Sequence, residues 1–194
     1  MHTSISAFGR SRIARRRAGQ AGFSLVEVSI VTAIVLLIAV IGIPAIGGYV
    51  MENKVPKVGQ ELARFVMHVR VNAGTSGDAP YEQIGTANLA AMVADSTVLT
   101  LAADGSVLHG LGGGGTVEIE PADAGAAFLL RLKQVNHVAC PSIASVLQRV
   151  AGRITIEAGG AVRTVKDAST TYNALSAESA CDKGDINQFV FHVS

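Results

Sequence analysis

The chain has 194 residues, of which 49% are hydrophobic and 16% charged. That length has room for one domain and an N-terminal appendage. The net charge of +1 hides two unlike parts, because residues 1–22 carry five arginines and no acid, which leaves 11 basic and 15 acidic residues in the rest. A basic head on a mildly acidic body is not the pattern of a nucleic-acid-binding protein, and it favours a segment held on the cytoplasmic side of a membrane.

Residues 23–51 follow the basic segment and are almost wholly apolar, with no charged side chain between Glu27 and Glu52. A helix over this stretch is about 36 Å long at ~1.5 Å per residue, enough to cross a hydrocarbon core of about 30 Å. Because the arginines lie on one side only, we expect the N-terminus in the cytoplasm and the following domain across the membrane.

Two other interpretations of this apolar stretch are weaker. A secretory signal peptide needs a short apolar core followed by small residues at a cleavage site. Here the run is long and is followed by Glu52, Asn53 and Lys54. A buried core helix of a soluble protein is disfavoured by the arginine cluster and by the length of the run.

Residues 52–74 are predicted to continue the helix in amphipathic form. Apolar side chains recur there at steps of three and four, at Val55, Val58, Leu62, Phe65 and Val69, and charged or polar residues fill most of the other face. Gly74 and Gly77 are expected to end the helix. Pro44 and Pro56 each remove a backbone donor, so we expect each to kink or loosen it.

Residues 75–194 have the glycine-rich, short-run texture of an α+β globular head. Helices are predicted over residues 86–94 and 141–150, and strands over 98–101, 116–120, 127–132, 153–157, 161–166 and 189–193. The Gly112–Gly115 tract is interpreted as a loop and not a phosphate cradle, because no Lys-Ser/Thr pair follows it. Short strands after a long helix predict an α+β fold in which the helix packs on an antiparallel sheet.

The two cysteines, Cys140 and Cys181, both lie in the C-terminal half. An even count beyond a membrane segment favours one disulfide in an oxidising compartment, with two buried free thiols as the alternative. A metal site needs more ligands, and no histidine has ligand spacing to either cysteine. The sequence Asp182-Lys183-Gly184-Asp185 is interpreted as a solvated turn, because a cation loop needs a longer run of alternating oxygens.

No catalytic residues and no cofactor are predicted. The histidines of the C-terminal three-quarters of the chain are scattered and form no H-x-x-x-H pair, at His68, His109, His137 and His192. Serine and threonine abound, but there is no G-x-S-x-G sequence. We therefore do not expect an enzyme.

Glu27 stands out, because a charge inside a membrane helix costs on the order of 2.5–3.5 kcal/mol. By itself it is either a functional carboxylate or one that sits at the interface. The residues from Gly22 through Phe23 to Glu27 resemble the processing signature of type IV prepilins, which is a glycine, a hydrophobic residue and an acid as the fifth residue after the cut. Pro44 falls where that family commonly has a helix-breaking proline, and the leader, apolar run and amphipathic extension follow in the family's order.

The resemblance implies a structural subunit of a type IV pilus. It implies that an inner-membrane prepilin peptidase removes residues 1–22 by cutting after Gly22, that Phe23 becomes N-methylated, and that Glu27 pairs with the amine of a neighbouring subunit. The implied partners are other copies of the chain or other pilins, the peptidase, the inner-membrane assembly machinery and, before assembly, the membrane itself; no nucleic acid is implied. The precursor would sit in the inner membrane with its head outside the cytoplasm, and the mature subunit in an extracellular filament for adhesion, aggregation, motility or secretion.

The 22-residue leader resembles that of type IVb pilins. So does the order of an apolar strand at residues 127–132, Cys140 opening a helix, and Cys181 before the last strand, as in the toxin-coregulated pilins. Phe23 departs from the Met or Leu that often begins the mature type IVb chain. A minor pilin or type II secretion pseudopilin is the alternative within the family. A single-span membrane protein with a periplasmic binding or enzymatic domain is the alternative outside it.

Overall fold

The computed structural model describes residues 22–73 and 77–194, apart from the side chains of Pro44 and Ala45. The leader up to residue 21 and Gly74 lie outside the described residues. The chain divides after Gly42 into two compact units, residues 1–42 and 43–194.

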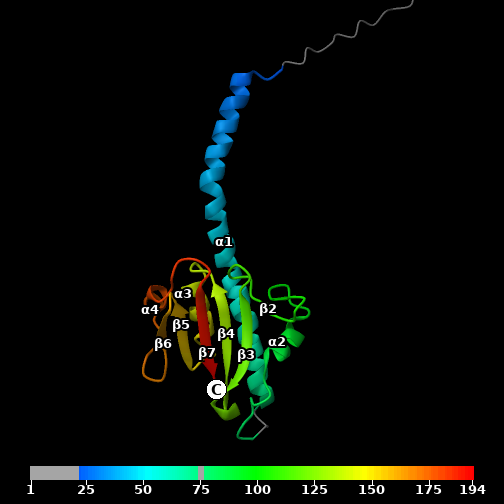
Figure 1. Ribbon diagram of the computed structural model, residues 1–194, viewed down its shortest axis with the longest axis vertical. Coiled ribbons are helices and arrows are strands. Elements are labelled where there is room, and N and C mark those ends of the chain that lie inside the picture. Colours follow the sequence, from blue (N-terminus) through cyan, green and yellow to red (C-terminus); the bar gives the residue numbers. More distant parts are fainter. Residues whose placement is uncertain (1–21, 74–76) are drawn as a thin grey trace, which may run out of the picture. The chain divides into compact units, whose positions relative to one another are not determined.

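The longest element is α1, one α-helix over Leu25–Ala73 (Figure 1). It covers both the apolar run and the amphipathic continuation, as the periodicity predicts, and it ends beside the predicted terminator Gly74. Helical backbone continues through Pro44 and Pro56. The side chain of Pro44 is not among the described parts of the chain, so the kink expected at this residue stays a prediction.

In the second unit, α1 contributes one face to the hydrophobic core. The buried side chains recur at helical spacing, at Val55, Val58, Leu62, Phe65 and Val66, and Val69 is packed against them at the margin. The amphipathic stripe predicted for this part of the helix is therefore confirmed, with Val66 added to it.

The second unit also holds a seven-stranded antiparallel sheet. Its strands are β1 (Thr100–Leu101), β2 (Val107–Leu108), β3 (Thr116–Ala122), β4 (Ala127–Val135), β5 (Arg153–Ala158), β6 (Ala161–Lys166) and β7 (Asn187–Val193). Their spatial order is β1-β2-β3-β4-β7-β5-β6, so the last strand of the chain lies in the middle of the sheet between β4 and β5 (Figure 1). The predicted α+β fold with an antiparallel sheet is confirmed.

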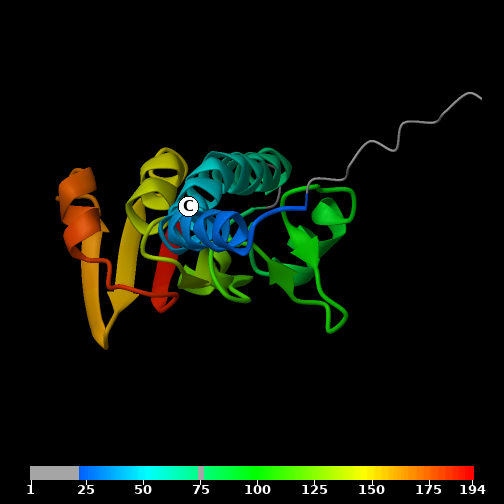
Figure 2. The same ribbon diagram turned by 90° about the horizontal axis from the view of Figure 1, so that it is seen from above.

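Short helices complete the unit: α2 (Thr86–Val93), the 3₁₀ turn η1 (Asp123–Gly125), α3 (Cys140–Leu147) and α4 (Ala174–Ser179). Figure 2 shows α3 beside the C-terminal part of α1 on one face of the sheet. The two helices approach closely at Gly59, where a Cβ atom would stand 2.5 Å from Cγ1 of Val146. A larger residue at position 59 would push these helices apart.

The strands alternate as expected for a sheet covered on one face. Along β7 the inward side chains are buried and the intervening ones half-buried, the inward set being Asn187, Phe189, Phe191 and Val193. The strands expected over 127–132 and 189–193 and the hairpin over 153–166 are confirmed, as are both predicted helices. The prediction missed β2 and α4, and β1 is shorter than expected.

Candidate assembly segment and disulfide region

Residues 22–24 lead into α1 without helical structure. Ser24 caps the helix, since its Oγ accepts a hydrogen bond from the backbone N of Val26 at 3.3 Å and its carbonyl accepts one from the N of Val28 at 3.1 Å. Phe23, the predicted first mature residue, is 81% exposed. The predicted cleavage point between Gly22 and Phe23 therefore lies in a short non-helical stretch immediately before a capped helix.

Glu27 lies in the first turn of α1. A carboxylate is favourable there because the unpaired N–H groups give the helix N-terminus a partial positive charge. Its side chain is exposed, and within residues 22–73 and 77–194 no ion pair involves it. The carboxylate is thus positioned at the N-terminal end of the helix with its side chain exposed.

The first unit's part of α1 shows apolar side chains on all sides. Almost every large apolar residue from Phe23 to Ile41 is exposed. The two hydroxyls that follow Glu27 bond within the helix, Ser29 Oγ to the carbonyl of Val26 and Thr32 Oγ1 to that of Val28, both at 2.8 Å. All polar side-chain groups near the helix start except Glu27 are therefore satisfied locally, as an apolar surrounding requires.

By length and composition α1 can cross a membrane, and it is the one such helix among the described residues. A helix that is apolar all round is stable only where lipid or other apolar helices surround it. The described part of the first unit supplies no such cover. The predicted transmembrane helix is supported.

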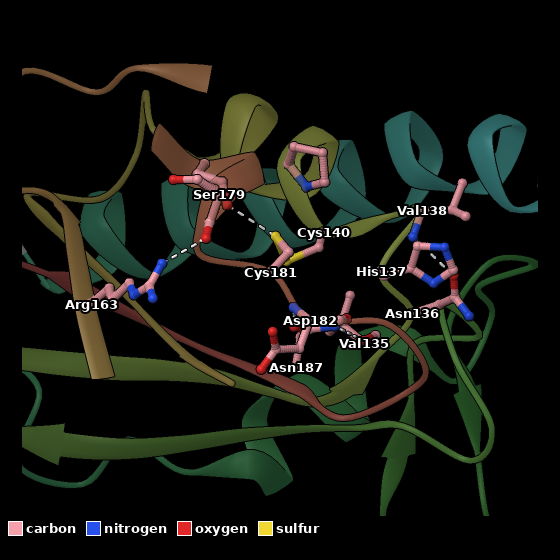
Figure 3. The surroundings of a disulfide bond; sticks show 12 residues. Val135, Asn136, His137, Val138, Cys140, Arg163, Ser179, Cys181, Asp182 and Asn187 are labelled. Carbon is pink, nitrogen blue, oxygen red and sulfur yellow. Dashed lines mark hydrogen bonds between the residues drawn. A yellow bond between two sulfur atoms is a disulfide. The ribbon is translucent and has the colours of Figure 1, made fainter. Parts of the chain in front are cut away.

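Cys140 and Cys181 form a disulfide with a Cα–Cα distance of 6.2 Å, across a sequence separation of 41 (Figure 3). The bond joins the first residue of α3 to the second residue after the end of α4. It encloses β5, β6 and both helices, which form one side of the head. The disulfide favoured from the cysteine count is confirmed, and the free-thiol alternative is wrong.

A buried asparagine organises the loop that follows the disulfide (Figure 3). Asn187, which is fully buried, donates from Nδ2 to the carbonyls of Val135 and Asp182 at 3.0 and 2.9 Å. Its Oδ1 accepts from the backbone N of Asp182 at 2.8 Å. The amide thus holds the loop at Asp182 against the end of β4.

The interpretation of residues 182–185 as a solvated turn is wrong for Asp185. Its Oδ2 accepts from the backbone N of Gly113 at 2.8 Å, and its Oδ1 accepts from Nδ2 of Asn136 at 2.5 Å. Asp182 and Lys183 are exposed as expected. Asp185 therefore connects three loops that are far apart in sequence. A local sequence pattern cannot reveal such long-range hydrogen bonds.

The histidines are not brought together. His68 is exposed on α1 beside Asn72, His137 lies in the loop before α3, and His192 pairs with Asp123 at 2.7 Å. His109 is buried apart from all of them. Residues 22–73 and 77–194 contain no group of three or more side chains suited to hold a metal ion.

Comparison with known proteins identifies the family. The family model described as PilS N terminal matches residues 70–194, which include the whole disulfide region. The chain belongs to the PilS family of type IV pilins, since that match covers well over half of it. The members of this family are structural subunits and not enzymes. The predicted family is therefore confirmed.

Among solved structures, the chain is similar to a type IVb pilin from Salmonella typhi, with 20% identity over 70% of this chain and 95% of that one and a TM-score of 0.46. It is also similar to TcpA, a type IV pilin from Vibrio cholerae El Tor, with 13% identity over 71% of this chain and 99% of that one and a TM-score of 0.42. A search of curated protein sequences found no match.

Proposed function

We propose that this chain is a prepilin that is cut after Gly22, methylated on the new amine of Phe23, and polymerised through the N-terminal half of α1 into a type IV pilus. Before assembly, residues 23–51 span the inner membrane and the head lies outside the cytoplasm. After assembly the same residues form the core of the extracellular filament. The partners are then a prepilin peptidase, the inner-membrane assembly machinery, and other copies of this chain or other pilins.

One observation carries the proposal. The apolar first half of α1, residues 25–50, is exposed all round and carries a single acid, Glu27, in its first turn. The hydrophobic core of the head forms without this half of the helix, because the first buried residue of the core is Val55. The exposed half therefore serves something outside the chain. Lipid satisfies it in the precursor, and the equivalent helices of other subunits satisfy it in the filament.

The role of Glu27 follows from charge. Cleavage after Gly22 creates an α-amine on Phe23, which is largely protonated near neutral pH because its reference pKa is roughly 7.7–8.0. An amine or a carboxylate buried alone among apolar helices is costly, whereas a close pair offsets the loss of hydration. Pairing Glu27 with the amine of a neighbouring subunit would thus make docking depend on prior cleavage.

We assign the subunit to the type IVb branch. The support is the order of elements in the head: β4, then Cys140 opening α3, then Cys181 before the last strand. This order resembles the toxin-coregulated pilins. The uses of such a filament that fit the proposal are adhesion, aggregation, motility or secretion.

The test of processing compares two glycine variants of the full chain expressed with a prepilin peptidase. A Cβ at either Gly22 or Gly42 meets nothing within 4 Å, so neither substitution disturbs the chain itself. Gly22→Val should remain uncut, whereas Gly42→Val should be cut like the parent, as judged by intact mass and N-terminal analysis. A Gly22→Val chain that is still cut at the same bond, or a parent that is never cut, would reject the proposal and favour a single-span membrane protein.

The abundance of the chain in filaments separates a major from a minor subunit. Electron microscopy of sheared surface filaments, followed by mass spectrometry of their main band, should find this chain as the principal component. A processed chain that is only a trace component of the filaments would instead be a minor pilin or a pseudopilin.

A further inference from the structure

His109 follows β2 and is fully buried, although a histidine carries two polar ring atoms. Its Nδ1 lies 2.9 Å from the backbone N of Leu111, and its Nε2 lies 2.8 Å from the carbonyl O of Lys133. An N–H can only donate and a carbonyl can only accept. The ring is therefore neutral, with its proton on Nε2 and the Nδ1 lone pair facing the Leu111 N–H.

The ring is confined by the Gly112–Gly115 loop. A Cβ on Gly115 would stand 2.4 Å from the Cε1 and Nε2 atoms of His109, and one on Gly112 would stand 1.9 Å from the carbonyl O of Gln134. The glycines let the loop backbone press onto β4 and onto the imidazole. His109 therefore cannot turn to other partners unless the loop lifts.

A positive charge on this ring would have no compensating partner. The charged groups on the surrounding elements are Lys54 of α1 near Gly110, Lys133 of β4 and Glu118 of β3, which bond each other at 2.7 Å, and Asp185 before β7. Asp185 is occupied by the Gly113 N–H and by Asn136, and neither carboxylate contacts the imidazole. Burial accordingly holds the pKa of His109 below its ordinary value, against a smaller opposing effect of the hydrogen bond to Lys133.

We propose that His109 is an acid-sensitive latch that holds residues 109–115 closed against β4 while its ring is neutral and releases them when the ring is doubly protonated. The second proton would go onto Nδ1 and point at the Leu111 N–H, so one hydrogen bond becomes a clash of two donors.

Release of the loop would reach the disulfide side of the head. The carbonyl of Leu111 accepts from the backbone N of Asn136 at 2.7 Å, and the N–H of Gly113 donates to Asp185. Lifting the loop breaks both bonds. The loop that follows Cys181 then loses one of its ties, while Asn187 still holds it.

The test is hydrogen exchange of single amides in the full chain, held in detergent micelles, between pH 7.5 and 5 and corrected for intrinsic exchange. The folded ring takes up its proton at a lower pH than the reference value of 6.5, so opening should become favoured as pH falls below 6.5. Protection of the Leu111 and Gly113 amides should fall by up to about tenfold per pH unit in that range. The Ala102 amide, bonded to the carbonyl of Ser106 in the β1–β2 turn, is the internal control and should stay level.

Two variants separate the latch from a merely structural histidine. His109→Gln cannot titrate, so its Leu111 and Gly113 amides should lose the pH dependence even if they are less protected throughout. His68→Gln changes an exposed histidine of α1 and should keep it. The latch is rejected if the parent shows no pH dependence at these amides, or if His109→Gln retains it. Should His109→Gln fail to fold, NMR of the parent's imidazole rings gives the answer: a His109 ring that titrates without any change at the Leu111 amide also rejects the latch.

Discussion

The two halves of α1 are built from similar apolar residues but lie in opposite surroundings. Leu37 in the first half is 64% exposed, whereas Leu62 in the second half is fully buried in the head. The difference comes from pattern and not from composition, since the second half confines its apolar side chains to one stripe. An apolar stripe can be covered by a sheet of the same chain, but a helix that is apolar all round needs lipid or other helices.

The largest change in the stability of the head is expected from removal of its disulfide. Replacing Cys140 and Cys181 together by serine should lower the free energy of unfolding by about 4 kcal/mol, because the unfolded chain regains the entropy of a large loop. The measurement is denaturant unfolding of the full chain in micelles with and without the bond. A change below about 1 kcal/mol would mean that the head does not depend on the cross-link.

The contrast between the two helix halves is tested by the same substitution in each. Leu62→Ala should lower the free energy of unfolding of the head by about 3 kcal/mol, because it leaves a cavity in a closed core. Leu37→Ala is the matched control and should leave that free energy unchanged. Equal effects of the two substitutions would show that the first half of α1 also belongs to the folded core.

The close approach of α1 and α3 gives a smaller effect. Gly59→Ala should cost about 1–2 kcal/mol, because its Cβ would stand 2.5 Å from Cγ1 of Val146. Adding Val146→Ala removes that methyl group and should recover part of the loss in a double-mutant cycle. If the two substitutions are simply additive, the helices do not meet at this point.

The elements that could be predicted from the sequence are those with a pattern among neighbouring residues. The period of the apolar residues identified both halves of α1, and the alternation at Phe189 and Phe191 identified the last strand. It could not place that strand between β4 and β5, because strand pairing across long separations depends on the whole fold. The six-residue helix α4 is too short to carry a clear period.

The long-range hydrogen bonds of polar side chains in the head were not predicted, for a similar reason. Asp185 and His109 act through backbone groups that lie far away in sequence or beneath a loop. Asn187 did carry a usable signal, since it is in phase with the inward residues of its strand. A polar residue at an inward position of a strand indicates a buried hydrogen-bonded group.

Substitution of Glu27 tests most directly whether subunits assemble through the exposed first half of α1. The parent, Glu27→Ala and Glu27→Gln are expressed as full chains, cleavage is scored by gel shift, and the share of each in sheared filaments is measured. Glu27→Ala should be cut like the parent but be absent from filaments, because a neighbour's amine left unpaired costs about 3–5 kcal/mol. Glu27→Gln should be milder, since its amide oxygen can still accept a hydrogen bond from the amine. A Glu27→Ala chain that is cut and assembles like the parent would contradict a pairing role for Glu27.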